Sequence, residues 1–136
     1  MENIFRIFAV VLVVFYMFCI NVIKADAEWT RLNEIDDDEI DFYVDVETIR
    51  KHDGYVYFWS LYDFVKPIED SLSASSYFQG DCNTFKMKAL SMLTYKEPMA
   101  GGNYDEDTSD GVSKWRYPTP DSIMYYILNF ICDKAK

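Results

Sequence analysis

The sequence has few of the residues on which most catalytic and metal sites depend. Its 136 residues include one histidine, three cysteines, five glycines and four prolines. Zinc clusters and glycine-rich phosphate loops need more of these residues at short spacing, so we expect no metal and no cofactor. Positive charge is scarce too, because 13 Lys and Arg stand against 23 Asp and Glu. The net charge of −10 argues against a nucleic-acid partner, since phosphate contacts require clustered cations.

Core-forming residues, in contrast, are abundant. Half of the residues are hydrophobic and 18% are aromatic, which is too apolar a composition for a disordered chain. The length suits one domain. The sequence therefore predicts a single globular domain.

Residues 1–27 have the composition of a secretory signal peptide. The run from Ile7 to Ile23 is 17 uncharged residues long, and Ala25 and Ala27 form the small-x-small pattern of a signal peptidase site. We expect cleavage before Glu28, which leaves a domain over residues 28–136. The alternative is a retained anchor, for which 17 residues is the lower length limit. Contact with a membrane is expected only through an uncleaved segment.

Cleavage would leave two cysteines, Cys82 and Cys132. An even number of cysteines in a small exported chain predicts a disulfide. A redox pair or a metal site would need Cys-x-x-Cys spacing or added histidines, and neither is present. We predict a disulfide between Cys82 and Cys132.

Alternating and β-branched or aromatic residues predict a series of strands. The expected strands are Trp29–Leu32, Ile40–Asp45, Tyr55–Phe64, a long strand over 77–95 bent near Gly80, and 112–117. Lys66-Pro67 is expected to end the third strand, and Ile68–Ser76 to be a polar connection. Residues 46–51 are expected to form at most a helical turn, and 96–111 a loop. In the long strand the expected core face runs from Phe85 through alternate residues to Tyr95.

One helix is expected at the C-terminus, with Thr119 as its N-cap and Pro120 at its first position. Its apolar stripe consists of Ile123, Met124, Ile127, Leu128 and Ile131. The predicted fold class is α+β, with an antiparallel sheet of about five to six strands and this helix packed on one face.

Few residues suggest chemistry. Asp105–Gly111 resembles a calcium loop, but its third acid and its glycine each come one position late, which favours a solvated turn. His52 is the only candidate general base, and its isolation favours a surface role. Lys86 and Lys88 form the only basic stripe on a strand, and they are the candidate ligand-binding residues because an acidic protein needs a local basic patch to approach anionic partners. We predict no catalytic residues and no enzyme activity.

A series of short landmarks is spread over the expected strands and turns. They are Tyr43-Val44-Asp45, Thr48-Ile49-Arg50, Gly54–Asp63, Asp81-Cys82, Tyr95, Gly101-Gly102, Trp115, Pro118, Ser122 and Cys132. Their order and spacing, from Trp29 to Cys132, resemble the surface-adhesin protein E family of exported bacterial proteins. The resemblance implies a sheet of about six strands with a C-terminal helix. It also implies a surface protein that binds host matrix or plasma proteins such as vitronectin, laminin and plasminogen, and that can form homodimers.

The expected function is thus that of an exported, non-enzymatic binding domain with a protein partner. Its expected location is the periplasm, the cell surface or the medium. The alternative is a periplasmic, envelope-associated structural or interaction protein without an adhesive role, in which a sheet edge would pair with a partner strand.

Overall fold

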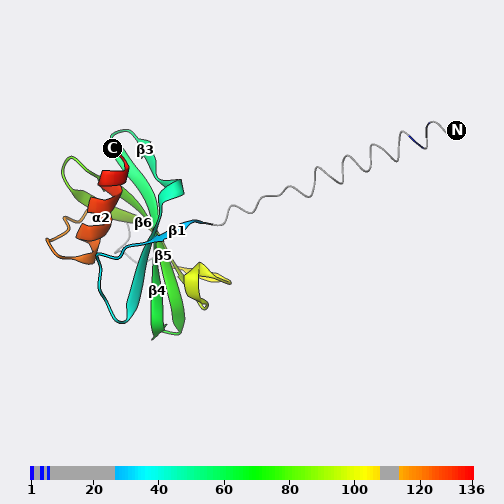
Figure 1. The fold of residues 1–136 in the computed structure, drawn as a ribbon, viewed down its shortest axis with the longest axis horizontal. Helices are drawn as coiled ribbons and strands as arrows, with labels where there is room; N and C mark the ends of the chain where they lie inside the picture. Colours follow the sequence, from blue (N-terminus) through cyan, green and yellow to red (C-terminus); the bar gives the residue numbers. More distant parts are fainter. Residues whose placement is uncertain (2–3, 5, 7–26, 108–113) are drawn as a thin grey trace.

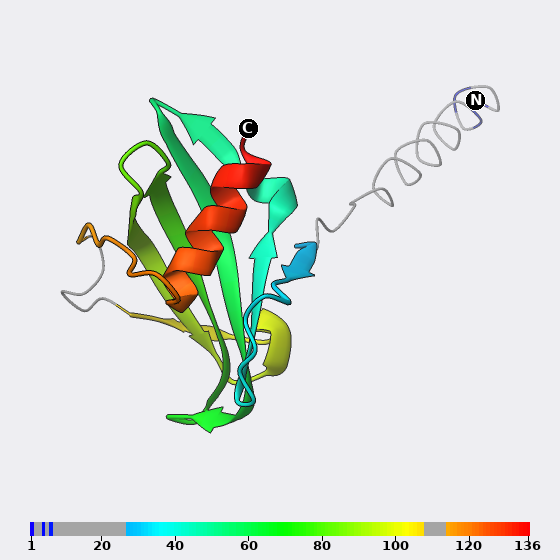
Figure 2. The same cartoon turned by 60° about the vertical axis from the view of Figure 1, so that its left-hand side comes forward.

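The computed structural model describes residues 1, 4, 6, 27–107 and 114–136. From Trp29 onward the chain is an antiparallel sheet with one helix laid across one face, which confirms the predicted α+β class (Figures 1 and 2). The strands are β1 (Trp29–Arg31), β2 (Ile40–Asp45), β3 (Arg50–His52), β4 (Tyr55–Ile68), β5 (Ser71–Asp81), β6 (Lys86–Tyr95) and β7 (Tyr104–Glu106). The helix is α2 (Ile123–Lys134), and short 3₁₀ turns form η1 (Val46–Thr48) and η2 (Pro98–Ala100).

The sheet is built around the hairpin of its two longest strands, β4 and β5. The order across the sheet is β1-β2-β4-β5-β6-β7, and every pair is antiparallel. β3 also pairs with β4, at residues 55–57, whereas β2 pairs with residues 60–64 of the same strand. Both therefore lie along one edge of β4, β3 near one end of the sheet and β2 further along.

The β4–β5 hairpin differs from the sequence prediction. The strand expected to end at Lys66-Pro67 continues to Ile68, and most of the expected connection over 68–76 belongs to β5. Glu69 and Asp70 join the strands in a two-residue turn with φ of 47° and 64°, so no glycine marks the turn in the sequence. The serines that made this stretch look like a loop, Ser71, Ser73, Ser75 and Ser76, are buried in the sheet.

The long strand predicted over 77–95 is two strands, β5 and β6, because the chain turns sharply between them. Asp81 organises this turn. One of its carboxylate oxygens accepts hydrogen bonds from the backbone N–H of Asn83 at 2.9 Å and of Thr84 at 3.1 Å. The other accepts from the Thr84 hydroxyl at 2.7 Å. Such local side-chain bonds favour turns over strand continuation.

The hydrogen bonds from Thr84 and Asn83, with the nearby Lys86 ammonium, lower the pKa of the Asp81 carboxyl below its ordinary value of 3.8. The folded state therefore favours the ionised form, so its contribution to stability is complete above pH 3.8 and is lost as pH falls through the lowered pKa.

We expect Asp81→Asn to lower the free energy of unfolding by about 1–3 kcal/mol at neutral pH. The difference from wild type should shrink in acid. Urea unfolding across pH measures this, with Asp53→Asn at the exposed β3–β4 turn as the control; a pH-independent difference would contradict it.

Three further expectations need correction at the ends of the sheet. The helical turn expected over 46–51 contains η1 but continues into β3, and the loop expected over 96–111 contains η2 and β7. In the strand expected over 112–117, residues 112 and 113 lie outside the described residues, and Arg116 forms a single bridge with Met87. Pairing with long neighbouring strands is what stabilises these three-residue strands, and the local sequence carries no signal for it.

A β-bulge in β6 changes which side chains face the helix. Phe78 pairs with Ala89, but Tyr77 pairs with Ser91, so Leu90 is an extra residue. Met87 and Ala89 belong to the helix face, as predicted. Beyond Leu90 the alternation is reversed, so the single core face predicted from Phe85 to Tyr95 is wrong in its second half.

The core lies between α2 and the sheet. Ile127, Leu128 and Ile131 are fully buried, which confirms the centre of the predicted apolar stripe. The sheet and the connection between β1 and β2 contribute Leu32, Phe42, Val44, Val56, Phe58, Phe78 and Met87. The helix begins later than predicted, with Ser122 as its N-cap in place of Thr119, because the Ser122 hydroxyl accepts the Tyr125 N–H.

A second, smaller layer covers part of the opposite face. The Ser73 hydroxyl donates to the Glu97 carbonyl at 2.6 Å and accepts the Ala100 N–H at 2.9 Å. Asp63 accepts the Met99 N–H at 2.6 Å. These bonds hold η2 against β4 and β5, so the opposite face is covered at the η2 end and is left open toward β3.

Candidate functional site

The open part of that face carries aromatic and basic side chains. We define the aromatic–basic face as Tyr55, Tyr57, Trp59, Tyr77, Lys86, Lys88 and Trp115. Its tyrosines and tryptophans are partly exposed, whereas Val56, Phe58 and Phe78, which alternate with them, are buried under the helix. The ring centroids of Trp59 and Tyr77 are 5.0 Å apart. A flat aromatic surface of this kind supplies large contact area at low entropic cost.

The two lysines predicted as ligand-binding residues are part of this face. Lys86 Nζ and Lys88 Nζ each lie 4.9 Å from the centroid of the Trp115 ring. The centroid of the Trp115 ring lies 5.7 Å from the centroid of the Tyr55 ring, which belongs to β4 on the other side of β5. Lys86 Nζ also lies 3.9 Å from a carboxylate oxygen of Asp81. The tryptophan thus holds both ammonium groups beside the aromatic residues of β4.

Charge is segregated along the molecule. The end formed by β3, the β5–β6 turn and the last turn of α2 holds most of the cations, namely Arg50, Lys51, Lys86, Lys88, Arg116, Lys134 and Lys136. The far end holds exposed acids of the 36–39 loop, the β4–β5 turn and β7. A basic end on a protein of net charge −10 can attract an acidic partner locally while the remainder repels it.

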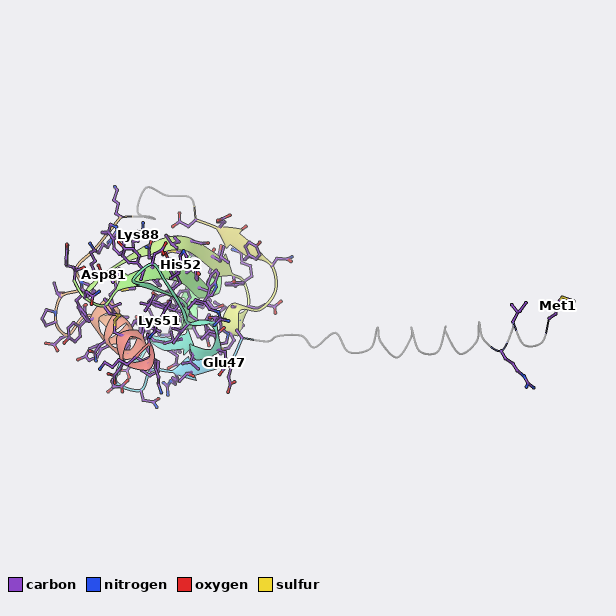
Figure 3. The ribbon with its side chains drawn as sticks, turned by 90° about the horizontal axis from the view of Figure 1, so that it is seen from above. Met1, Glu47, Lys51, His52, Asp81 and Lys88 are labelled. Carbon is purple, nitrogen blue, oxygen red and sulfur yellow. A yellow bond between two sulfur atoms is a disulfide. The ribbon has the colours of Figure 1, made fainter. Side chains whose placement is uncertain are left out.

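The basic end contains an open hollow. It has a volume of about 570 Å³ and lies between the β3–β4 hairpin, the β5–β6 turn and the end of α2. Lys51, His52 and Lys136 line it together with Cys82 and Cys132. Figure 3, which looks at the molecule from above, shows Lys51, His52, Asp81 and Lys88 on the body of the domain.

Cys82 and Cys132 form a disulfide, as the sequence predicts. Their Cα atoms are 5.6 Å apart, within the usual range for this bond. Cys82 lies in the β5–β6 turn and Cys132 in the last turns of α2. The bond therefore joins the helix to the sheet at the basic end.

The structure does not assemble the candidate catalytic residues. His52 is exposed and its Nε2 lies 3.0 Å from the Asp53 carboxylate, and Cys82 in the same hollow has no free thiol. Asp105 and Glu106 belong to β7, and residues 108–111 of the calcium-like loop lie outside the described residues. Within the described ranges no group of His, Cys, Asp and Glu could hold a metal ion. In the same ranges, no helix combines the length and apolarity needed to cross a membrane.

Sequence reasoning missed Arg50 of the basic end and the place of Trp115 in the aromatic–basic face. Arg50 was placed in a helical turn, whereas it pairs with Tyr57 as part of β3. Trp115 is expected on a strand, but the sequence does not predict its contacts with Tyr55, Lys86 and Lys88. The signal that could have found Arg50 is the Asp53-Gly54 dipeptide, because such a turn typically joins two paired strands.

Comparison with known proteins gives the family. The profile of the surface-adhesin protein E family matches residues 29–133. Crystal form II of Haemophilus influenzae protein E superposes with a TM-score of 0.64 at 18% identity, covering 83% of this chain and 94% of that one. Another structure of H. influenzae protein E gives a TM-score of 0.60 at 19% identity, covering 81% and 87%. No curated protein sequence matches significantly.

The chain belongs to the surface-adhesin protein E family, because the family profile covers most of its length. It is a surface-adhesin-like domain. The structural likeness, at under one fifth identity, independently supports the fold.

Proposed function

We propose that the protein is an exported, non-enzymatic binding domain that holds a protein partner on its aromatic–basic face. The observation that carries this proposal is the placement of Lys86 and Lys88 over Trp115, beside the partly exposed aromatic residues of β4 and β5. Interfaces are enriched in aromatic residues, and a local basic patch steers acidic surfaces toward an otherwise acidic protein. Family membership makes a host matrix or plasma protein the first partner class to test.

Charge reversal tests this surface. We expect Lys86→Glu/Lys88→Glu to weaken binding of the domain to immobilised matrix and plasma proteins by about tenfold and to flatten its salt dependence. The matched control is Lys66→Glu/Lys96→Glu, which changes the net charge equally at exposed positions away from this face. Surface plasmon resonance over a salt series measures both. Equal loss in the two variants would contradict the proposed surface. Binding to envelope proteins but to no host protein would favour the alternative, a periplasmic interaction protein.

We also propose that residues 1–27 are a cleaved signal peptide, since Ala25 and Ala27 suit the peptidase and Glu28 begins a polar segment. Intact-mass measurement of the protein isolated from the envelope or the medium should show a chain that begins at Glu28. The control is Ala27→Arg, which should block cleavage. A wild-type species that retains residues 1–27 would identify the segment as a membrane anchor.

A further inference from the structure

We propose that β3 accepts an acidic, extended polypeptide segment of the partner as an additional strand. This inference rests on the proposed function and adds the partner's chemistry and the mode of binding. Three features carry it: the outer edge of β3, which no strand of the described residues covers, its position between two cationic surfaces, and the segregation of charge along the molecule.

The outer edge of β3 has no strand beside it among the described residues, since β3 pairs only with β4. Asp53 and Gly54, with φ of 49° and 79°, make the two-residue turn that closes this hairpin. In such a hairpin His52 and Tyr55 form the first hydrogen-bonded pair, so the backbone N–H and C=O of Lys51 point outward. An added strand would pair with these two groups.

Side chains of β3 alternate between two cationic surfaces. Lys51 pairs with the buried Val56 on the helix side and lines the hollow with Lys136. Arg50 and His52 pair with Tyr57 and Tyr55 on the opposite side, next to the aromatic–basic face. Successive side chains of an added strand would point alternately to these two sides, so acidic residues in either register would meet cations.

Two carboxylates partly neutralise the positive charge around β3. An Asp53 carboxylate oxygen lies 3.0 Å from His52 Nε2, and an Asp133 carboxylate oxygen lies 2.6 Å from Lys136 Nζ. Lys51 and Arg50 have no such ion pair among the described residues. A short acidic segment would meet these two cations without reaching the acidic end, whereas a long polyanion or an anionic membrane would also face that end. The charge distribution therefore favours a peptide segment over a polysaccharide or a lipid surface.

The test uses the domain from Glu28 and a blocked peptide of about eight residues with alternating glutamate and threonine. NMR titration should shift the amides of residues 50–52, and the peptide should slow exchange of the Lys51 amide. Lys51→Glu and Arg50→Glu should each weaken binding by about tenfold, whereas Lys66→Glu should leave it unchanged. Lys51→Ala and Lys51→Pro separate the charge from the outward N–H, because both lose the ammonium but only proline loses the donor.

A peptide with N-methylated backbone amides is the main control, since it keeps the charges but cannot complete the ladder. Equal affinity for the two peptides, or equal binding by Lys51→Ala and Lys51→Pro, would overturn strand addition. Tighter binding to short dextran sulfate or to phosphatidylglycerol vesicles would overturn the choice of a polypeptide. The proposed function is separable: loss of partner binding in Lys86→Glu/Lys88→Glu with no effect of β3 substitutions would retain it and reject this inference.

Discussion

Replacing both half-cystines, Cys82→Ala/Cys132→Ala, should lower the free energy of unfolding by about 2–5 kcal/mol. The bond closes a segment with a sequence separation of 50 residues, and the chain-entropy model assigns about 4 kcal/mol to a loop of that length. Removal of the disulfide mainly destabilises the docking of α2, because this helix is 12 residues long and too short to be stable alone in water. Without the bond the helix is held only by its packing on the sheet.

Urea unfolding followed by far-ultraviolet circular dichroism measures this loss. Wild-type protein in reductant should behave as the double variant does, since both lack the same constraint. Asn83→Ala, at the exposed neighbour of Cys82, is the matched control and should stay within about 0.5 kcal/mol of wild type. An unchanged unfolding midpoint on reduction would show that packing alone fixes the helix.

Leu128→Ala should lower the free energy of unfolding by about 2–5 kcal/mol, because it removes a fully buried side chain from the centre of the core. Leu128 packs directly over Gly80. A Cβ at that glycine would lie 2.8 Å from Leu128 Cδ1 and 3.0 Å from Val56 Cγ2, so Gly80→Ala forces these packed side chains to shift. Overpacking of this kind costs about 1–3 kcal/mol, slightly offset by reduced freedom of the unfolded chain.

The two substitutions should therefore be non-additive. In the Leu128→Ala background the cavity can accept the new methyl group, so Gly80→Ala should cost much less there than in wild type. A double-mutant cycle in urea measures the coupling, with Asn129→Ala on the exposed side of α2 as a control. Strict additivity would mean that the helix does not pack against Gly80.

The sequence identified features whose signal is local. Alternation and aromatic content located β2 and the first part of β4, and the apolar period located α2. The cysteine count identified the disulfide, because the predicted removal of residues 1–27 would leave only Cys82 and Cys132, which allow a single pairing. Lys86 and Lys88 could be proposed from the sequence as binding residues because basic residues are scarce in this chain, and their role in binding stays a prediction.

The features that were missed depend on tertiary context. The left-handed conformations of Glu69 and Asp70 have no glycine to signal them, so the β4–β5 hairpin was not predicted. The bulge at Leu90 leaves no mark in a sequence that alternates plausibly on both sides of it. Trp115 is far from Tyr55 in sequence, and only the folded sheet places the two rings together.

The bulge at Leu90 also has a consequence for cooperativity. It lets β6 contribute Met87 to the helix layer and Tyr95 to the layer under η2, and the Tyr95 hydroxyl lies 3.1 Å from that of Ser75. Both layers rest on β4 and β5, but on opposite faces and at opposite ends. Local opening of either layer therefore exposes only one face of the shared hairpin, whereas separation of β4 from β5 removes the support of both. The slowest-exchanging amides should lie in this hairpin, and the domain should unfold as one unit.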